Sequence, residues 1–168
     1  QRNMVNVTSD GEHVCVGIYE IPSMEAACDV ARRYTYGGSV YSGTGLNMLA
    51  TWEARPLSRV MRIPTAGGPA ETVWEERTWI NHVNTSPTLP NLLTFCHEGP
   101  WHLVDHRIWG LDTATGKAWK IRPRMVEQER VGHEYWYMDG IHVGYHGIKP
   151  DGTKETHEEF NDRLRPML

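Results

Sequence analysis

Short runs of β-branched and aromatic residues alternate with turn residues along most of this chain. Such runs occur at Val14–Tyr19, Arg59–Ile63 and Glu71–Glu75, and the pattern returns at Arg107–Leu111 and Ala118–Ile121. Two runs of this kind around a short Gly-containing loop are typical of a β-hairpin. The pattern therefore predicts a protein built mainly from short antiparallel strands.

A second kind of turn recurs between the hairpins. Asp10-Gly11, Pro87–Pro90 and Asp139-Gly140 each precede another strand-like run, so two kinds of hairpin alternate. Four strands per unit, repeated about every 40 to 45 residues, are typical of the blades of a β-propeller. We expect an all-β fold, a single partial propeller domain over residues 1–168 with blades at 4–77 and 78–124 and an incomplete one at 129–168. Tryptophans recur at strand positions and are expected to fill the space between blades.

The first unit is longer than one blade, and its excess, residues 22–50, includes a helical pattern. Ser23–Arg33 is rich in Ala, Glu and Arg, Pro22 suits an early helical position, and Ser23 suits the N-cap. The Gly-containing segments Gly37–Ser39 and Ser42–Gly45 are expected to be loop. We interpret this region as a helical insertion, and the sequence leaves open whether it covers a site or is a surface excursion without function.

Composition narrows the class of protein. The net charge is −4 and no basic run is present, which argues against a nucleic-acid partner, and the apolar runs are too short to cross a membrane. Cys15, Cys28 and Cys96 are odd in number and widely spaced, which predicts buried free thiols in a reducing compartment, the cytoplasm. The chain begins at Gln1 and about two and a half blades cannot close a ring, so we expect a segment of a longer propeller. Pairing with another copy, a homo-oligomer, is a hypothesis for how its open edge is covered.

Two His-Glu pairs stand at the ends of aromatic, glycine-punctuated runs. His97-Glu98 and His133-Glu134 form the pairs, and Arg107 lies between them. Because histidine changes charge near neutral pH, two histidines close to an arginine suggest proton transfer on an anionic substrate. From the residues alone, a packed structural histidine and a surface ion pair of Arg107 with Asp105 are the more usual interpretations.

Other polar residues carry weaker signals. His82 and Asn84 precede a turn and fit either contacts to sugar hydroxyls or turn capping. His142 and His146 are four residues apart on a predicted strand, on one face of it, which suits a metal only if a third ligand is near. Glu134 is expected on the face of its strand opposite to His133.

Four motifs, in order, resemble the oligogalacturonate lyase family, also called family 22 pectate lyases. They are His82-Val83-Asn84-Thr85-Ser86-Pro87, Phe95-Cys96-His97-Glu98-Gly99-Pro100, Val104-Asp105-His106-Arg107-Ile108-Trp109 and Gly132-His133-Glu134-Tyr135-Trp136. The similarity extends from about Met4 to Thr153 and is strongest from Trp79 to Gly147. The resemblance implies a seven-bladed propeller that cleaves short galacturonides by β-elimination.

The resemblance also implies roles for individual residues. His133 is the catalytic base, Arg107 the catalytic arginine, and His97 lines the same pocket. A divalent metal, typically Mn²⁺, binds the uronate, but the Gln-x-x-His-Pro-His stretch that supplies ligands in the family does not occur in this sequence. No metal ligand is therefore assigned here, and both metal binding and activity of the isolated chain are open.

The implied chemistry suits these side chains. The C5 proton of galacturonate is weakly acidic, so its removal needs a base and a cation that stabilises the developing negative charge. Neutral histidine is a base near neutral pH, and the guanidinium fork fits a carboxylate. The leading hypothesis is a lyase acting on an oligogalacturonide resembling digalacturonate. The alternative is a non-catalytic propeller module that binds carbohydrate or protein.

Overall fold

The computed structural model describes residues 4–20, 23, 25–26, 28–29, 32, 44–100, 103–122, 130–148 and 165–166. Within them, antiparallel β-sheets dominate. The first sheet contains β1 (Val5–Val7), β2 (His13–Tyr19), β3 (Leu57–Pro64) and β4 (Glu71–Arg77). The second contains β5 (Ile80–Thr85), β6 (Leu92–His97), β7 (Ile108–Asp112) and β8 (Lys117–Arg122). The third contains β9 (Arg130–Trp136), β10 (His142–Ile148) and β11 (Arg165–Pro166).

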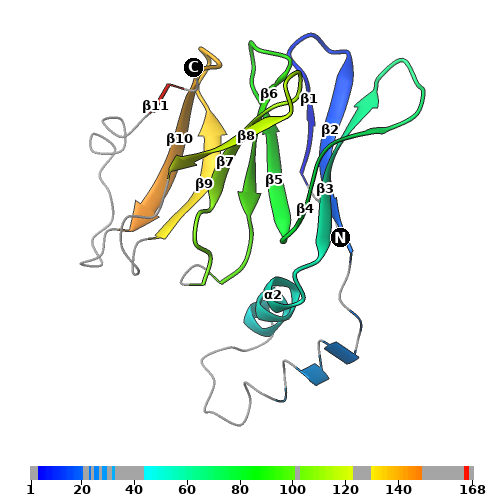
Figure 1. Ribbon diagram of the computed structural model, residues 1–168. Helices are drawn as coiled ribbons and strands as arrows, with labels where there is room; N and C mark the ends of the chain where they lie inside the picture. Colours follow the sequence, from blue (N-terminus) through cyan, green and yellow to red (C-terminus); the bar gives the residue numbers. More distant parts are fainter. Residues whose placement is uncertain are drawn as a thin grey trace.

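Each sheet is a meander in which strands that follow one another in the chain are hydrogen-bonded neighbours. The three sheets stand side by side in chain order, and β5 contacts both β1 and β9 (Figure 1). First strands that lie together at the inner edge of successive antiparallel sheets are the arrangement of propeller blades. The prediction of an all-β propeller segment is therefore confirmed.

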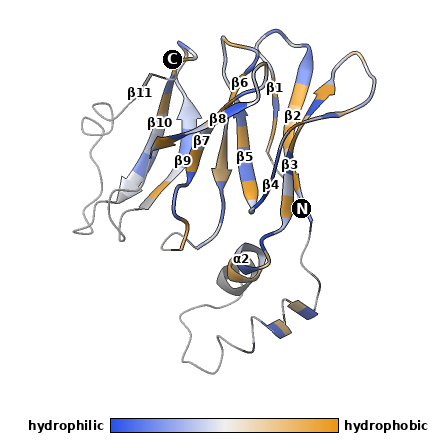
Figure 2. Ribbon diagram, in the orientation of Figure 1, coloured by the Kyte–Doolittle hydropathy of each residue, from blue (hydrophilic) through white to orange (hydrophobic). Residues whose placement is uncertain are grey.

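Two hydrophobic clusters join the sheets, and hydrophobic residues recur along β2 and alternate with hydrophilic ones along β5 (Figure 2). Between the first and second sheets the buried residues are Cys15, Val60, Ile80, Val83, Leu93, Phe95 and Leu111. Between the second and third they are Leu92, Ile108, Ile121, Val131, Val143 and Tyr145. Trp74, Trp109, Trp119 and Trp136 pack against these clusters, so these tryptophans fill the space between blades as expected.

Hydrogen bonds from the first strand of the second sheet tie the three sheets together at the inner edge. Thr85 Oγ1 donates to the carbonyl of Val7 (2.7 Å) in the first sheet. Ser86 Oγ, just after β5, donates to the carbonyl of Gly140 (2.7 Å), and Trp136 Nε1 donates to the carbonyl of Asn84 (3.0 Å). Because one of these bonds spans 78 residues of chain and the others more than 50, the inner edge is fixed by contacts between sheets rather than within them.

The insertion between β2 and β3 is helical. Glu25, Ala26, Cys28, Asp29 and Arg32 are in helical conformation, and Ser23 Oγ accepts a hydrogen bond from the N–H of Ala26 (3.1 Å), as an N-cap does. The expectation of loop at Ser42–Gly45 was wrong at its end, because a second helix, α2 (Thr44–Glu53), begins there. Its buried Leu49 and Ala50 explain why a helix forms despite the glycine, since packing outweighs a propensity cost of about 1 kcal/mol. The expected loop at Gly37–Ser39 lies outside the described residues.

The cysteines are unpaired, but their burial differs from the expectation. Cys15 and Cys96 are buried, whereas Cys28 is exposed on the helical insertion. In the part of the chain that the structure describes, no helix has the length and apolar character needed to cross a bilayer.

Candidate active site

Two histidines adopt a backbone conformation that directs their rings toward one another across a sheet boundary. His82 on β5 has φ of 50° and His133 on β9 has φ of 52°. This left-handed region is uncommon for residues other than glycine, although His, Asn and Asp enter it more readily than most. The two rings lie parallel, with centroids 6.0 Å apart and 12° between their planes. In β5 the pairing register also breaks between Asn81 and Asn84, which frees His82 from the regular ladder.

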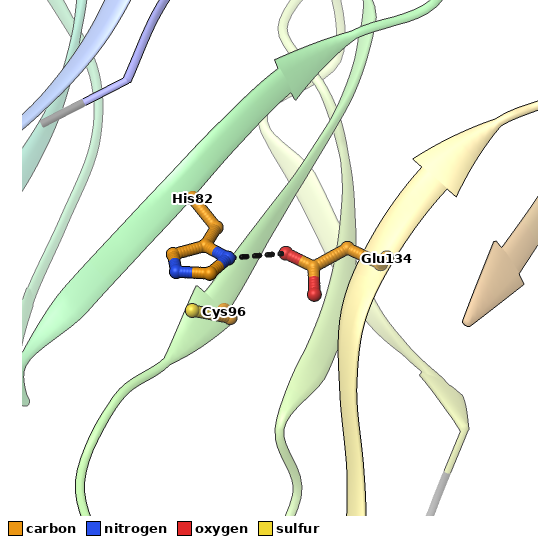
Figure 3. A group of neighbouring side chains, drawn as sticks. All are labelled: His82, Cys96 and Glu134. Carbon is orange, nitrogen blue, oxygen red and sulfur yellow. Dashed lines mark ion pairs between the residues drawn. The ribbon is translucent and has the colours of Figure 1, made fainter. Parts of the chain in front are cut away.

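Behind this pair lies a group of largely buried ionisable side chains, called here the inner cluster: His82, Cys96, Glu98, Arg107 and Glu134. Arg107 binds Glu98 through two hydrogen bonds, from Nη1 to Oε1 (2.6 Å) and from Nη2 to Oε2 (3.1 Å). His82 lies between two carboxylates, with Nε2 at 3.5 Å from Glu98 and Nδ1 at 3.8 Å from Glu134. Figure 3 shows the side chains of His82, Cys96 and Glu134, which point toward one another from β5, β6 and β9.

Burial and charge set the protonation of the inner cluster. Burial alone would raise the pKa of Glu98, but the hydrogen bonds and charge of Arg107 lower it below its ordinary value, so Glu98 is ionised. Burial opposes the charge of Arg107, yet its neighbours Cys96 and Glu98 raise the guanidinium pKa. Burial raises the pKa of Glu134 to about 7. The pKa of His82 is lowered, by burial first, although Glu98 acts in the opposite direction.

His133 is exposed and is held from the side by a third histidine. Its Nδ1 lies 2.9 Å from Nε2 of His146 on β10, and the two rings meet edge to face with centroids 4.4 Å apart. Burial, together with the charges of His133 and Arg107, lowers the pKa of His146. Its ring is therefore neutral at neutral pH and can accept a hydrogen bond. When Nδ1 of His133 donates to His146, the basic lone pair of His133 is on Nε2.

The structure brings together most, but not all, of the residues singled out in the sequence. His82 stacks on His133, and Glu98 contacts both His82 and Arg107, so these side chains share one region. Asn84 is beside them, but its amide faces backbone, donating to the carbonyls of His82 (3.3 Å) and Glu134 (3.5 Å).

His97 does not join this region. Its Nε2 lies 2.8 Å from Oε1 of Glu76, and its ring packs against Phe95 and Trp109. Side chains alternate between the two faces of a strand, so His97 points away from its neighbour Cys96 and toward the first sheet. The expectation that His97 lines the same pocket as Arg107 therefore does not match its contacts.

Two carboxylates of the site were missed by sequence reasoning. Glu98 and Glu134 each follow a histidine that was selected, and each is buried in the inner cluster. Glu134 was expected on the face of its strand opposite to His133, and the burial agrees with this, because His133 is exposed and Glu134 is buried. The usable signal was the repeated His-Glu pair itself, because a glutamate inside an aromatic, apolar run is costly to bury without a purpose.

The pairing of His142 with His146 is not observed. His142 Nδ1 lies 2.6 Å from Asp139 Oδ2, while His146 contacts His133. The register of β10 shifts between Gly144 and His146, so the even spacing does not keep the two rings on one face.

Known proteins match this chain in sequence. Residues 48–156 match the family model described as oligogalacturonate lyase. An oligogalacturonide lyase from Pectobacterium atrosepticum is 37% identical over 98 residues, which is 58% of this chain and 25% of that protein. An oligogalacturonate lyase from Dickeya dadantii is 33% identical over 90 residues, 54% of this chain and 23% of that protein. The matched part of this chain thus corresponds to about a quarter of the length of these relatives.

Solved structures match the fold. An oligogalacturonate lyase in complex with manganese superposes with a TM-score of 0.71 at 20% identity, covering 98% of this chain and 40% of that one. An oligogalacturonate lyase from Vibrio parahaemolyticus gives a TM-score of 0.68, also at 20% identity and with the same coverage. At 20% identity this similarity shows a shared fold, and it extends over all three sheets.

Proposed function

Because this chain belongs to the oligogalacturonate lyase family, we propose that it carries the proton-transfer site of a lyase that cleaves short oligogalacturonides by β-elimination. The observation that supports this best is the position of His82, whose ring stacks on the exposed His133 and lies 3.5 Å from the carboxylate of Glu98, which binds Arg107. A base and a fixed cation in one region, on adjacent sheets, are what removal of a proton next to a carboxylate requires.

His133 acts as the base in this proposal. Its ring is exposed to solvent, and the contact with His146 holds it in one orientation and leaves Nε2 as the basic atom. Nε2 takes the C5 proton of the galacturonate, and the electron pair of that bond forms the C4–C5 double bond. The bond from C4 to its oxygen breaks, and the leaving sugar oxygen takes a proton from solvent, which gives a 4,5-unsaturated sugar. A positioned base of this kind contributes typically about 10² to 10⁴-fold to the rate.

Arg107 stabilises the charge that develops on the uronate carboxylate. Its guanidinium is joined to this region through Glu98, which binds it with both oxygens and whose Oε2 lies 3.5 Å from Nε2 of His82. His82, partly exposed at the boundary between sheets, is proposed to contact sugar hydroxyls. Asn84 is proposed to hold the backbone of His82 and Glu134 rather than the sugar itself.

A divalent metal is the cofactor that the resemblance implies, and the described residues do not fit manganese. The candidate group is His82, Cys96 and Glu134, whose ligand atoms lie within 4.8 Å of one another. Mn²⁺ prefers oxygen and imidazole ligands, whereas the pKa of the buried Cys96 thiol is raised well above its usual value by burial. The neighbouring cation Arg107 also opposes a second positive charge. No step is therefore assigned to a metal at these residues.

The test is the formation of the unsaturated product. Digalacturonate with added Mn²⁺ should give rising ultraviolet absorbance, and His133→Ala should abolish it. His142→Ala is a matched control, because this histidine is on the neighbouring strand but pairs with Asp139, and it should retain activity. Binding of digalacturonate to the protein without any product would favour the non-catalytic binding module.

A further inference from the structure

Glu98 holds the guanidinium of Arg107 in a two-point contact inside the protein. The two hydrogen bonds are 2.6 and 3.1 Å long, and the residues are only 6% and 5% exposed. A bidentate pair fixes the plane and the direction of the guanidinium, which a single contact does not. The orientation of Arg107 therefore depends on where the carboxylate of Glu98 is.

Glu98 is itself held on several sides. Its backbone N–H donates to the carbonyl of Trp79 (2.7 Å), and its Oε1 accepts from the N–H of Gly99 (3.1 Å). Its Oε2 also lies 3.5 Å from His82 Nε2 and 3.8 Å from Cys96 Sγ. The carboxylate of Glu98 is thus oriented by backbone and side-chain contacts that do not involve Arg107.

The helix α2 packs against Gly99, the residue that follows Glu98. Gly99 has φ of 149°, and a Cβ there would lie 2.5 Å from Cδ1 of Trp52 and 3.0 Å from Cγ2 of Val104. The indole therefore occupies the space where a side chain at position 99 would be. Leu103, in the same loop between β6 and β7, packs against the core of α2. The helix inserted into the first sheet thereby contacts the loop of the second sheet that begins at Glu98 and ends at Arg107.

We propose that Glu98 is a positioning residue for Arg107, and that helix α2 keeps it in place through the contact of Trp52 with Gly99. This positioning role rests on the proposed function in one respect, which is that Arg107 acts on a uronate. It gives the insertion a role in the site without contact to the substrate: the helix supports the loop, the loop orients Glu98, and Glu98 orients the guanidinium.

The first experiment measures the guanidinium of Arg107 directly, by NMR of arginine side chains in the purified protein. In the wild type the bidentate pair should slow rotation and give resolved Nη proton signals, assigned by their loss in Arg107→Lys. Glu98→Gln, which keeps the shape but removes the charge, should merge them, whereas Glu98→Asp should restore part of the separation. Unchanged signals in Glu98→Gln would overturn the role of Glu98.

The second experiment substitutes Trp52 on α2 and leaves the charges of Glu98 and Arg107 in place. It therefore tests whether the support of the loop orients Arg107 even where Glu98→Gln does not fold. Trp52→Ala should broaden the Arg107 signals and lower kcat by roughly tenfold to a hundredfold, the size expected for a small misplacement of a catalytic group. Trp52→Phe, which keeps an aromatic ring on Gly99, should recover most of the loss. The matched control is Trp119→Ala, which removes a tryptophan from the cluster between the second and third sheets and should leave the Arg107 signals unchanged.

The two experiments separate the inference from the proposed function. A wild-type protein without lyase activity, but with Arg107 signals that respond to Glu98 and Trp52, would refute the proposed function and support the positioning. Arg107 signals in Trp52→Ala that equal those of Trp119→Ala would refute the role of α2.

Discussion

Glu134 should make the protein less stable as the pH rises, and Glu134→Gln should remove this effect. Its side chain is completely buried, and among the described residues no hydrogen bond of ordinary geometry reaches either oxygen. Burial raises its pKa from an ordinary value of 4.5 to about 7, against the opposing influence of its own backbone N–H and of Arg107. The folded protein therefore keeps this proton over a range in which the unfolded chain has lost it.

The sign and size of the effect follow from linkage. Below about pH 4.5 both states hold the proton, and the stabilisation is complete. Between about pH 4.5 and 7 only the folded state holds it, so the free energy of unfolding falls as the pH rises. A pKa difference of about 2.5, at about 1.4 kcal/mol for each pH unit, corresponds to a loss of about 3 kcal/mol that is complete above about pH 7.

Urea unfolding followed by tryptophan fluorescence, at several values between about pH 4 and pH 8, gives the measurement. The difference in stability between wild type and Glu134→Gln should change by about 3 kcal/mol over this range, because glutamine has the same shape and does not titrate. Glu71→Gln is the control, since this exposed carboxylate forms a surface pair with Arg62 and contributes little. A pH-independent difference between wild type and Glu134→Gln would refute the argument that Glu134 is buried without adequate partners.

Two further substitutions test how the sheets are held. Gly140→Ala should destabilise the protein by about 2 to 4 kcal/mol in thermal unfolding, because the new Cβ would lie 1.8 Å from Thr88 Oγ1. Gly116→Ala is the control for backbone strain, because Gly116 has a similar φ of 69° but no atom lies within 4 Å of its added Cβ, and it should cost only about 1 kcal/mol. Equal losses of stability in Gly140→Ala and Gly116→Ala would contradict the steric explanation. Ser58→Ala should cost about 1 to 3 kcal/mol in urea unfolding, because the buried Ser58 Oγ accepts the N–H of Ile80 (3.2 Å) across the first two sheets, and a neutral result would mean that another acceptor replaces it.

The strands and the propeller class could be predicted because both depend on local pattern. Alternation and turn chemistry are properties of neighbouring residues, and the N-cap at Ser23 is read in the same way. Helix α2 was missed because its stability comes from packing of Leu49 and Ala50 against Leu103, about 50 residues away, which no local pattern encodes.

The site was predictable to a different degree at each residue. Motifs singled out Arg107 and His133, but no role was predicted for Glu98 or Glu134, because both carboxylates meet His82, which lies on another strand. The alternation rule, applied to β6, would have separated His97 from Cys96 correctly. On β9 the same rule agrees with the burial, because His133 is exposed and Glu134 is buried, but nothing in the sequence announces the left-handed φ of His133.

The unusual backbone angles of His82 and His133 have a consequence for how such a protein can change over evolutionary time. A residue held at positive φ carries a conformational cost of order 1 to 3 kcal/mol, and glycine or asparagine relieves it. Substitutions that improve stability would therefore replace these two imidazoles. A lineage that retains both histidines must be under continuous selection for what the rings do, and a lineage released from that selection should lose them before it loses its hydrophobic core.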